Sequence, residues 1–455
     1  MNFKSTRAKS KVLNFSQVVE EGLATDGGLY VPEYFPDISA KLDSWEGLDY
    51  PTLCFEFFKL FTQEIPEGDL KEIVFNSYNK FDDAQIAPMK KLTDKLFILE
   101  LFHGSTLAFK DFALQLLGNL YEYILTKSGK TMNVLGATSG DTGSAAISAL
   151  LGKRGVNIFM LYPEGRISPL QERQMTCTGA ENVFPIAISG TFDDAQMMVK
   201  SLFGDVEFKN KWDLRAINSI NMARILAQCV YYIFAYLKVE KSQRENIEFV
   251  VPTGNFGNVL AGWFAYKMGM KVKGFKVATN QNDILFRLFD TGVYKLDDVK
   301  PSYAPSMDIQ IASNFERFIY YMENQNAEKV CEIMDSFSKN AMWEFDNFEK
   351  SNFSASRMTD EEIPAVIADI YKKYDYIIDP HTACAFADIN EESLTIVLST
   401  ASPAKFPELI VDTINVEPKA DSLEKLKSLT IVNSKMKVDL GDLREFINLR
   451  GLKND

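Results

Sequence analysis

Histidine and cysteine are scarce in this sequence. Only two histidines, His103 and His381, occur in 455 residues, and no HExxH pattern is present, so we predict no metal site. The five cysteines form no CxxC pair, which argues against a zinc site and against a disulfide framework. A protein without disulfides suits a reducing compartment. We therefore expect it in the cytoplasm.

Positive charge and long apolar runs are scarce as well. Lys and Arg number 49 against 62 Asp and Glu, and the formal net charge of −13 disfavours nucleic acid and anionic membranes as partners. The longest strongly apolar run, Cys229–Leu237, is far shorter than the roughly 20 residues that span a bilayer. The polar N-terminus shows no export signal. An anionic ligand must therefore be bound by a local site.

What is present is the composition of a folded protein with several domains. Hydrophobic residues make up 46% of the chain and charged residues 24%. After about residue 95, short apolar runs alternate with helical patterns, which predicts an α/β fold with mostly parallel sheets and helices on both faces. The predicted strands are Phe97–Leu101, Met132–Leu135, Ile158–Tyr162, Val183–Ile188, Ile247–Val251, Gly274–Ala278 and Leu394–Leu398.

Changes of pattern predict how the chain divides. Residues 1–95 are aromatic and mainly helical, which indicates an added N-terminal domain. We assign residues 96–131 and 219–455 to a large domain and residues 132–218 to a small, mobile α/β domain. A charged helical segment at about 290–373 is expected to be an insertion over the large domain, or a lid.

Two turns that follow predicted strands can bind anions. Ser139-Gly140-Asp141-Thr142 leads into a helix of small residues, where free N–H groups and the helix dipole favour a negative charge. In Gly254-Asn255-Phe256-Gly257-Asn258, the glycines permit positive φ and the amides offer neutral donors to a phosphate. Each turn alone could be an ordinary structural turn. Both, however, follow strands of a parallel sheet and would open toward one crevice.

Two further segments supply reactive side chains. Lys110 lies between Phe109 and Phe112, and burial there would lower the pKa of its amine toward the neutral form that makes Schiff bases. A solvated surface lysine is the alternative, but we expect Lys110 to be the amine of the crevice. Thr400 follows the strand Leu394–Leu398 and can either cap the next helix or bind a ring nitrogen. These groups suit a carbonyl cofactor with a phosphate tail.

A possible cationic site precedes a long helical pattern that runs to Leu237. Asn218 and Ser219 lie near the start of this pattern, and Arg224 lies a turn inside. They can be a helix cap and a surface arginine. Alternatively, the guanidinium of Arg224 can bind two oxygens of an anion while the amide and hydroxyl fix its position.

In chain order, these motifs closely resemble the threonine synthases, a family in the tryptophan-synthase-β-like group (fold type II) of pyridoxal-phosphate enzymes. The resemblance is carried by Gly22–Pro32, His103–Phe112, Ala137–Ala146, Asn218–Arg224, Gly254–Asn258 and Thr400–Phe406. It implies pyridoxal 5'-phosphate as the cofactor. The implied reaction is that of a carbon–oxygen lyase, which turns O-phospho-L-homoserine and water into L-threonine and phosphate as the last step of threonine biosynthesis.

The resemblance also implies a role for each motif. Lys110 is expected to form the Schiff base with the cofactor, Gly254 to Asn258 to bind its phosphate, and Thr400 to bind its pyridine nitrogen. The Ser139–Thr142 turn is expected to bind the substrate carboxylate. Two residues depart from the family pattern: Ser105 replaces the usual proline of an HGPT motif, and Ser402 stands where some members have histidine.

The substrate phosphate is assigned by the same resemblance to Asn218, Ser219 and Arg224. A serine or threonine dehydratase would share the cofactor and fold but would need no such second phosphate site. A catalytically silent relative that only binds ligands is the other alternative, and the intact Lys110 counts against it. Whether the protein is a monomer or a homodimer stays open.

Overall fold

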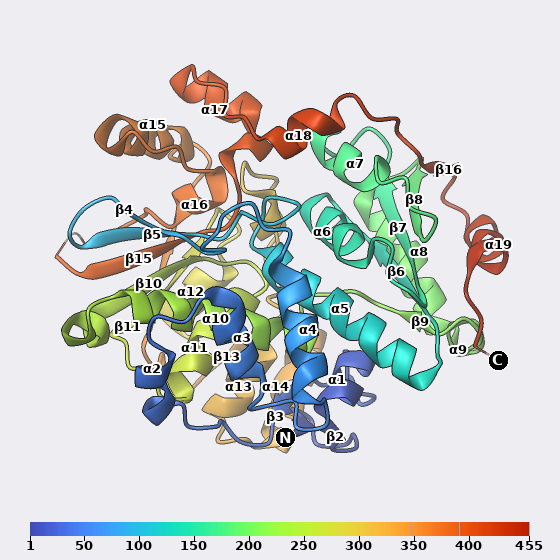
Figure 1. The fold of residues 1–455 in the computed structure, drawn as a ribbon, viewed down its shortest axis with the longest axis horizontal. Coiled ribbons are helices and arrows are strands. Elements are labelled where there is room, and N and C mark those ends of the chain that lie inside the picture. Colours follow the sequence, from blue (N-terminus) through green and yellow to red (C-terminus); the bar gives the residue numbers. More distant parts are fainter. Residues whose placement is uncertain (347, 391, 455) are drawn as a thin grey trace.

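Two mostly parallel sheets organise the fold (Figure 1). The computed structural model describes residues 1–346, 348–390 and 392–454. In this part of the chain, the larger sheet has the order β14-β11-β10-β15-β5-β4, in which only β4 is antiparallel to its neighbour. Its strands are β4 (Met89–Lys91), β5 (Leu96–Glu100), β10 (Ile247–Pro252), β11 (Gly274–Thr279), β14 (Phe353–Arg357) and β15 (Leu394–Ser399). The predicted fold class is confirmed.

The smaller sheet is parallel throughout its described strands and has the order β16-β8-β7-β6-β9. Its strands are β6 (Met132–Ala137), β7 (Val156–Pro163), β8 (Val183–Ile188), β9 (Leu214–Arg215) and β16 (Ser434–Met436). Every strand predicted from an apolar run overlaps an observed strand, because such runs are buried on both faces of a covered parallel sheet. β7, for example, is buried along its whole length.

Helices cover both sheets (Figure 1). α10 (Met222–Lys238) packs against α3 (Tyr50–Phe58), α5 (Lys110–Ser128) and α11 (Gly257–Lys267), and its residues from Met222 to Tyr236 are all buried. The helices around the larger sheet and the site are α5 (Lys110–Ser128), α11 (Gly257–Lys267), α12 (Ile284–Thr291), α13 (Phe315–Met322), α14 (Ala327–Asn340), α15 (Ile363–Tyr374), α16 (Pro380–Cys384) and α17 (Pro407–Ile414), with the short 3-10 helices η1 (Lys241–Asn246), η2 (Pro305–Met307) and η3 (Pro403–Lys405). Those near the smaller sheet are α6 (Asp141–Leu150), α7 (Pro169–Thr176), α8 (Phe192–Gly204), α9 (Val206–Lys211), α18 (Asp421–Leu426) and α19 (Leu440–Arg450).

The N-terminal segment packs against α5 and α10. It contains a small antiparallel sheet and four helices, and a cluster of edge-on rings joins Tyr50 to Phe112 of α5 and Phe234 of α10. Its last strand, β4, pairs with β5 of the larger sheet, so the segment does not end cleanly at residue 95. Its elements are β1 (Asn2–Ser5), β2 (Leu13–Asn14), β3 (Tyr30–Pro32), α1 (Phe15–Glu21), α2 (Ser39–Trp45), α3 (Tyr50–Phe58) and α4 (Glu67–Tyr78).

The segment 290–373 differs from the predicted helical insertion. Besides helices it holds the antiparallel pair β12 (Val293–Lys295) and β13 (Met342–Glu344), and it also supplies β14, which pairs with β11 at the edge of the larger sheet. The strand was missed because its sequence, Phe-Ser-Ala-Ser-Arg, lacks a continuous apolar run.

The C-terminal segment also differs from the prediction, which placed all of 219–455 in the large domain. β16 pairs with β8 of the smaller sheet, and α19 lies on the same side of the molecule as that sheet (Figure 1). Leu443 and Ile447 of α19 are buried in a cluster with residues of this sheet. The chain thus returns to the smaller sheet after completing the larger one. The division into domains otherwise stays a prediction. No helix in the described residues is long and apolar enough to cross a membrane.

Candidate active site

A cavity of about 350 Å³ lies where β6, β10 and β15 end. All of the predicted site residues line it except Gly140 and Asn218, which lie in the same loops beside lining residues. The lining set comprises Lys110, Ser139, Asp141, Thr142, Ser219, Arg224, Gly254, Asn255, Phe256, Gly257, Asn258 and Thr400. The carboxyl ends of parallel strands meet at one edge of a sheet, which brings these distant segments together.

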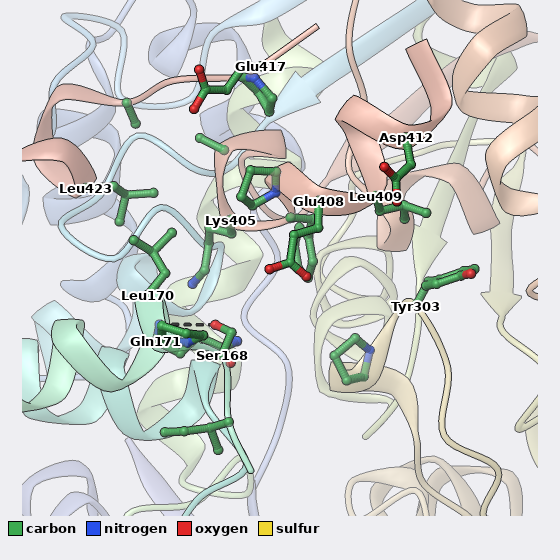
Figure 2. A pocket seen from close by; sticks show the side chains of 18 of the residues that line it. Ser168, Leu170, Gln171, Tyr303, Lys405, Glu408, Leu409, Asp412, Glu417 and Leu423 are labelled. Atoms are coloured by element: carbon green, nitrogen blue, oxygen red, sulfur yellow. Dashed lines mark hydrogen bonds between the residues drawn. The ribbon is translucent and has the colours of Figure 1, made fainter. Parts of the chain in front are cut away.

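A larger cavity of about 1070 Å³ adjoins the first and shares Ser139 and Pro305 with it. Figure 2 shows this second cavity, lined by Ser168 and Gln171 of the α7 region and by Tyr303, Glu408 and Asp412 of other segments. It contains none of the predicted cofactor residues. We therefore take the smaller cavity as the candidate active site.

Lys110 is the first residue of α5, and its amine lies in the smaller cavity. Nζ donates a hydrogen bond to Oγ of Ser306 over 3.1 Å. Burial lowers the pKa of Lys110 to about 8, with Asp141 opposing the change and the nearby cations Lys405 and Arg224 contributing to it. A considerable fraction of this amine is thus neutral near pH 8, which suits a nucleophile.

A second amine, which sequence reasoning missed, lies close to Lys110. Lys405 Nζ is 2.7 Å from Asp141 Oδ1 and also donates to the backbone oxygen of Thr106 over 2.9 Å. Lys110 stays the predicted amine of the cavity, since Lys110 lines it and Lys405 does not. Lys405 belongs to the Thr400–Phe406 motif, but nothing local in the sequence shows that its side chain turns inward.

Asp141 is held from three sides. Besides Lys405, its carboxylate accepts hydrogen bonds from Ser306 Oγ (2.9 Å) and Gln171 Nε2 (3.0 Å). Burial works against ionisation, but Lys405 and Lys110 hold the pKa of Asp141 well below its usual range. The side chain is thus a fixed anion that is already paired. It is not free to bind a substrate carboxylate, although the turn around it can.

The turn 139–142 does offer donors through its backbone. The N–H groups of Gly140 and Gly143 donate to Thr138 Oγ1, whereas those of Asp141 and Thr142 make no hydrogen bond within the described part of the chain. Both begin α6. Two free donors at a helix start form a site for an anionic oxygen.

The turn 254–258 opens α11 in a conformation that differs from our expectation. Positive φ occurs at Phe256 (61°) and not at Gly254 or Gly257. The left-handed conformation costs about 1–2 kcal/mol for a residue with a side chain, and burial of the Phe256 ring against Phe289 and Phe315 offsets that cost. Gly254 is needed instead for close packing, since a Cβ there would lie 3.1 Å from the Ser306 carbonyl oxygen.

Several donors of this turn lack partners among the described residues. The backbone N–H groups of Asn255, Gly257 and Asn258 make no hydrogen bond there. The Oδ1 atom of Asn258 accepts from the hydroxyls of Tyr231 and Tyr232, which fixes the amide and leaves its buried Nδ2 without a partner. Buried donors are normally satisfied, so this cluster indicates a bound anion.

Arg224 is buried in the same cavity, which excludes the surface arginine considered above. Its Nη1 donates to the backbone oxygen of Asn218, its Nε has no partner, and it forms no ion pair with any described residue. Burial lowers the pKa of Arg224 to about 10. The cap of α10 is Asn221, not Asn218. A buried cation without a counter-ion is costly, and an anionic ligand would compensate it.

Asn314 connects the two anion-binding loops. Its Nδ2 donates to the backbone oxygens of Ser219 (3.2 Å) and Asn255 (3.1 Å). The neighbouring Arg317 donates to the backbone oxygens of Ile220 and Tyr30. The N-terminal segment that contains Gly22–Pro32 thereby supports the loop before α10, a relationship that the sequence alone did not indicate.

Comparison with known proteins shows the family of this chain. A family model described as the threonine synthase N terminus matches residues 2–78, and one described as pyridoxal-phosphate dependent enzyme matches residues 85–396. The chain belongs to the threonine synthase family. Like other members, it is a pyridoxal-phosphate-dependent enzyme.

Relatives of this threonine synthase family member match over nearly the whole chain. The threonine synthase of Schizosaccharomyces pombe is 41% identical, with 90% of this chain and 88% of the relative covered. That of Saccharomyces cerevisiae is 40% identical, with 96% and 94% covered. The crystal structure of PLP-bound threonine synthase from Brucella melitensis is 38% identical, covers 99% of both chains and has a TM-score of 0.96.

The residues of this cavity fit pyridoxal phosphate. Lys110 supplies an amine, and the turn 254–258 supplies free backbone donors together with the unpartnered Nδ2 of Asn258. Thr400 is buried at the end of β15, and its hydroxyl makes no hydrogen bond within the described residues. The N-cap of the next helix, η3, is Ser402, so the alternative role of Thr400 as a helix cap is wrong.

His381 is a further lining residue that sequence reasoning missed. Its Nδ1 donates to Asp379 Oδ2 (2.8 Å), and its Nε2 accepts a hydrogen bond from the backbone N–H of Ser306 (3.2 Å). This arrangement requires one proton on Nδ1 and none on Nε2, and so a neutral ring. His381 thus fixes the position of the segment that carries Ser306.

Proposed function

We propose that this enzyme converts O-phospho-L-homoserine and water into L-threonine and phosphate. The observation that carries the proposal is the buried guanidinium of Arg224, which has no acidic partner among the described residues and lines the same cavity as the amine of Lys110. One anion, the cofactor phosphate, is accounted for by the turn 254–258. Arg224 therefore calls for a second anion, and the phosphate of the substrate supplies it.

We assign three groups of this chain to the cofactor. Lys110 forms the covalent bond through its amine. The turn made of Gly254, Asn255, Phe256, Gly257 and Asn258 binds the phosphate. Its donors are the free N–H groups of Asn255, Gly257 and Asn258 and the side-chain amide of Asn258. The neutral hydroxyl of Thr400 donates a hydrogen bond to the pyridine nitrogen and does not force its protonation.

Two loops are assigned to the substrate. Ser139, Gly140, Asp141 and Thr142 bind the α-carboxylate, with the backbone of this turn as donor and the Asp141 side chain only holding its shape. Asn218, Ser219 and Arg224 bind the phosphate, with the guanidinium as the charged partner. Asn218 does not line the cavity. It contributes through its backbone oxygen, which accepts a hydrogen bond from Arg224 Nη1.

Within this arrangement, Lys110 moves protons at Cα, Cβ and Cγ of the substrate, because its amine lines the same cavity as both loops and has a pKa of about 8. Pyridoxal phosphate, when bound, acts as the electron sink. Arg224 holds the phosphate that leaves Cγ, and water is then added at Cβ. We propose that the region 132–218 closes over the site to keep water out until the phosphate has left.

A serine or threonine dehydratase is the alternative enzyme, and it leaves Arg224 without a function. A silent binding protein leaves the lowered pKa of Lys110 without a function. The test is to record the absorption spectrum of the purified protein and then measure phosphate release from O-phospho-L-homoserine and ketoacid formation from serine and threonine. A colourless protein, or ketoacid formation without phosphate release, contradicts the proposal.

We also propose that the enzyme works in the cytoplasm, as a monomer or homodimer. All five cysteines are free thiols, and three of them are buried, which suits a reducing compartment. Cell fractionation and the molar mass in solution are the corresponding measurements.

A further inference from the structure

Ser306 of η2 lies between the amine of Lys110 and the carboxylate of Asp141. Its Oγ is 3.1 Å from Lys110 Nζ and 2.9 Å from Asp141 Oδ2. The backbone N–H of Ser306 is bonded to His381, which holds the residue in place. A single hydroxyl thus separates the reactive amine from a fixed negative charge.

The partners of this hydroxyl determine the direction of both hydrogen bonds. The carboxylate of Asp141 is ionised and can only accept, so the one proton of Ser306 Oγ points to Asp141. Toward Lys110 the same oxygen can then only accept. Lys110 must donate an N–H, and when its amine is neutral the lone pair is left to point elsewhere.

We propose that Ser306 is a positioning residue for Lys110, which accepts an N–H of the free amine, keeps it apart from Asp141 and thereby leaves its lone pair directed into the cavity. The proposal rests on the assignment of Lys110 in the proposed function. It explains why a paired carboxylate lies so close to an amine that has to react in its neutral form.

Removal of the hydroxyl should change the protonation of Lys110. Without Ser306 Oγ, the amine can move into direct contact with Asp141, and an opposite charge within about 4 Å raises the pKa of an amine by about one unit or more. The other charged groups near Lys110 are unchanged by such a substitution. The groups that face it are Asp141 of α6, Lys405 of η3, Arg224 of α10, Asp111 of α5 and the neutral His381 of α16.

The experiment measures how fast the apoenzyme binds added pyridoxal phosphate through Lys110, by absorbance, as a function of pH. In Ser306→Ala we expect the midpoint of the rate to rise by about one pH unit. Ser306→Thr keeps the hydroxyl and should retain the native midpoint. Ser306→Val has nearly the size of threonine but no hydroxyl, and it should shift upward like alanine.

A midpoint that is unchanged or lower in both the alanine and the valine variants would overturn the proposal. Should the alanine variant fail to fold, the threonine and valine pair decides the question. Ser302→Ala is the matched control, because Ser302 stabilises the same segment through Asp308 without contacting Lys110. A shift in this control as large as in Ser306→Ala would reduce Ser306 to a structural role. The assay requires no O-phospho-L-homoserine, so its failure is distinct from failure of the proposed reaction.

Discussion

The amine of Lys405 lies 2.7 Å from the carboxylate of Asp141, and these side chains are only 1% and 6% exposed. Lys405 follows β15 of the larger sheet, whereas Asp141 begins α6 beside the smaller sheet. The pair therefore connects the part of the site beside the larger sheet with the part beside the smaller sheet. If the region 132–218 moves during the reaction, this contact must either act as the pivot or break.

Substitution of Lys405 should be strongly destabilising. We expect Lys405→Met to lower the free energy of unfolding by about 3–5 kcal/mol, because it removes the ion-pair partner of the buried Asp141 carboxylate. Urea denaturation is the measurement. The exposed pair Lys241–Asp43 is the control, and Lys241→Met should cost less than about 1 kcal/mol. Equal losses in the two variants would contradict the importance of the buried pair.

Lys110, not Lys405, should carry the cofactor. Lys405 is engaged by Asp141 and by the Thr106 backbone, whereas Lys110 has a pKa of about 8. Lys110→Ala should abolish both the yellow colour and turnover. Borohydride reduction followed by peptide mapping identifies the labelled lysine, and a label on Lys405 would refute the assignment.

Binding of the cofactor by the apoenzyme should increase with pH. A lysine with a lowered pKa becomes neutral, and hence nucleophilic, as the pH rises through that value, here about 8. The absorbance-monitored rate should therefore rise between about pH 7 and pH 9 and then level off. A rise centred near the ordinary lysine value of about 10.4 would show that the amine is not desolvated.

Arg224→Ala should leave the absorption spectrum intact but lower kcat/KM for O-phospho-L-homoserine at least about tenfold, or roughly 1.4 kcal/mol. Arg224→Lys should recover only part of this loss, because an ammonium group lacks the planar fork. Steady-state phosphate release is the measurement. The 87% exposed Arg154 provides the control, and Arg154→Ala should be near native. Near-native activity of Arg224→Ala would make Arg166 of the adjoining cavity the next candidate.

Thr400→Ala should retain the covalent bond to the cofactor but weaken its retention by about 0.5–1.5 kcal/mol, the contribution of one neutral hydrogen bond. Thr400→Ser keeps the hydroxyl and should be close to native. Equilibrium dialysis of the cofactor from both variants is the measurement. Unchanged affinity and turnover in the alanine variant would remove Thr400 from the site.

The sequence by itself determined the fold class, the central strands and the segments that form the cavity. Continuous apolar runs such as Val183–Ile188 can only be buried strands in a covered sheet, and loops after parallel strands converge at one edge. It also indicated Lys110, because its apolar neighbours suggest a reactive amine, whereas Arg224 was assigned to an anion only through the resemblance of its motif to the threonine synthases. These properties depend on neighbours along the chain.

Only the tertiary structure decided which side chains meet. Ser306 and Asp141 are 165 positions apart, and the contact of Lys405 with Asp141 is likewise non-local, so neither leaves a periodic pattern in the sequence. The same holds for β14 and β16, whose short polar sequences become strands only because the sheet edges of β11 and β8 pair with them. The positive φ at Phe256 rather than at a glycine depends on burial of its ring by remote aromatic residues. Local propensity cannot predict such contacts, because their free energy comes from partners brought together only when the chain has folded.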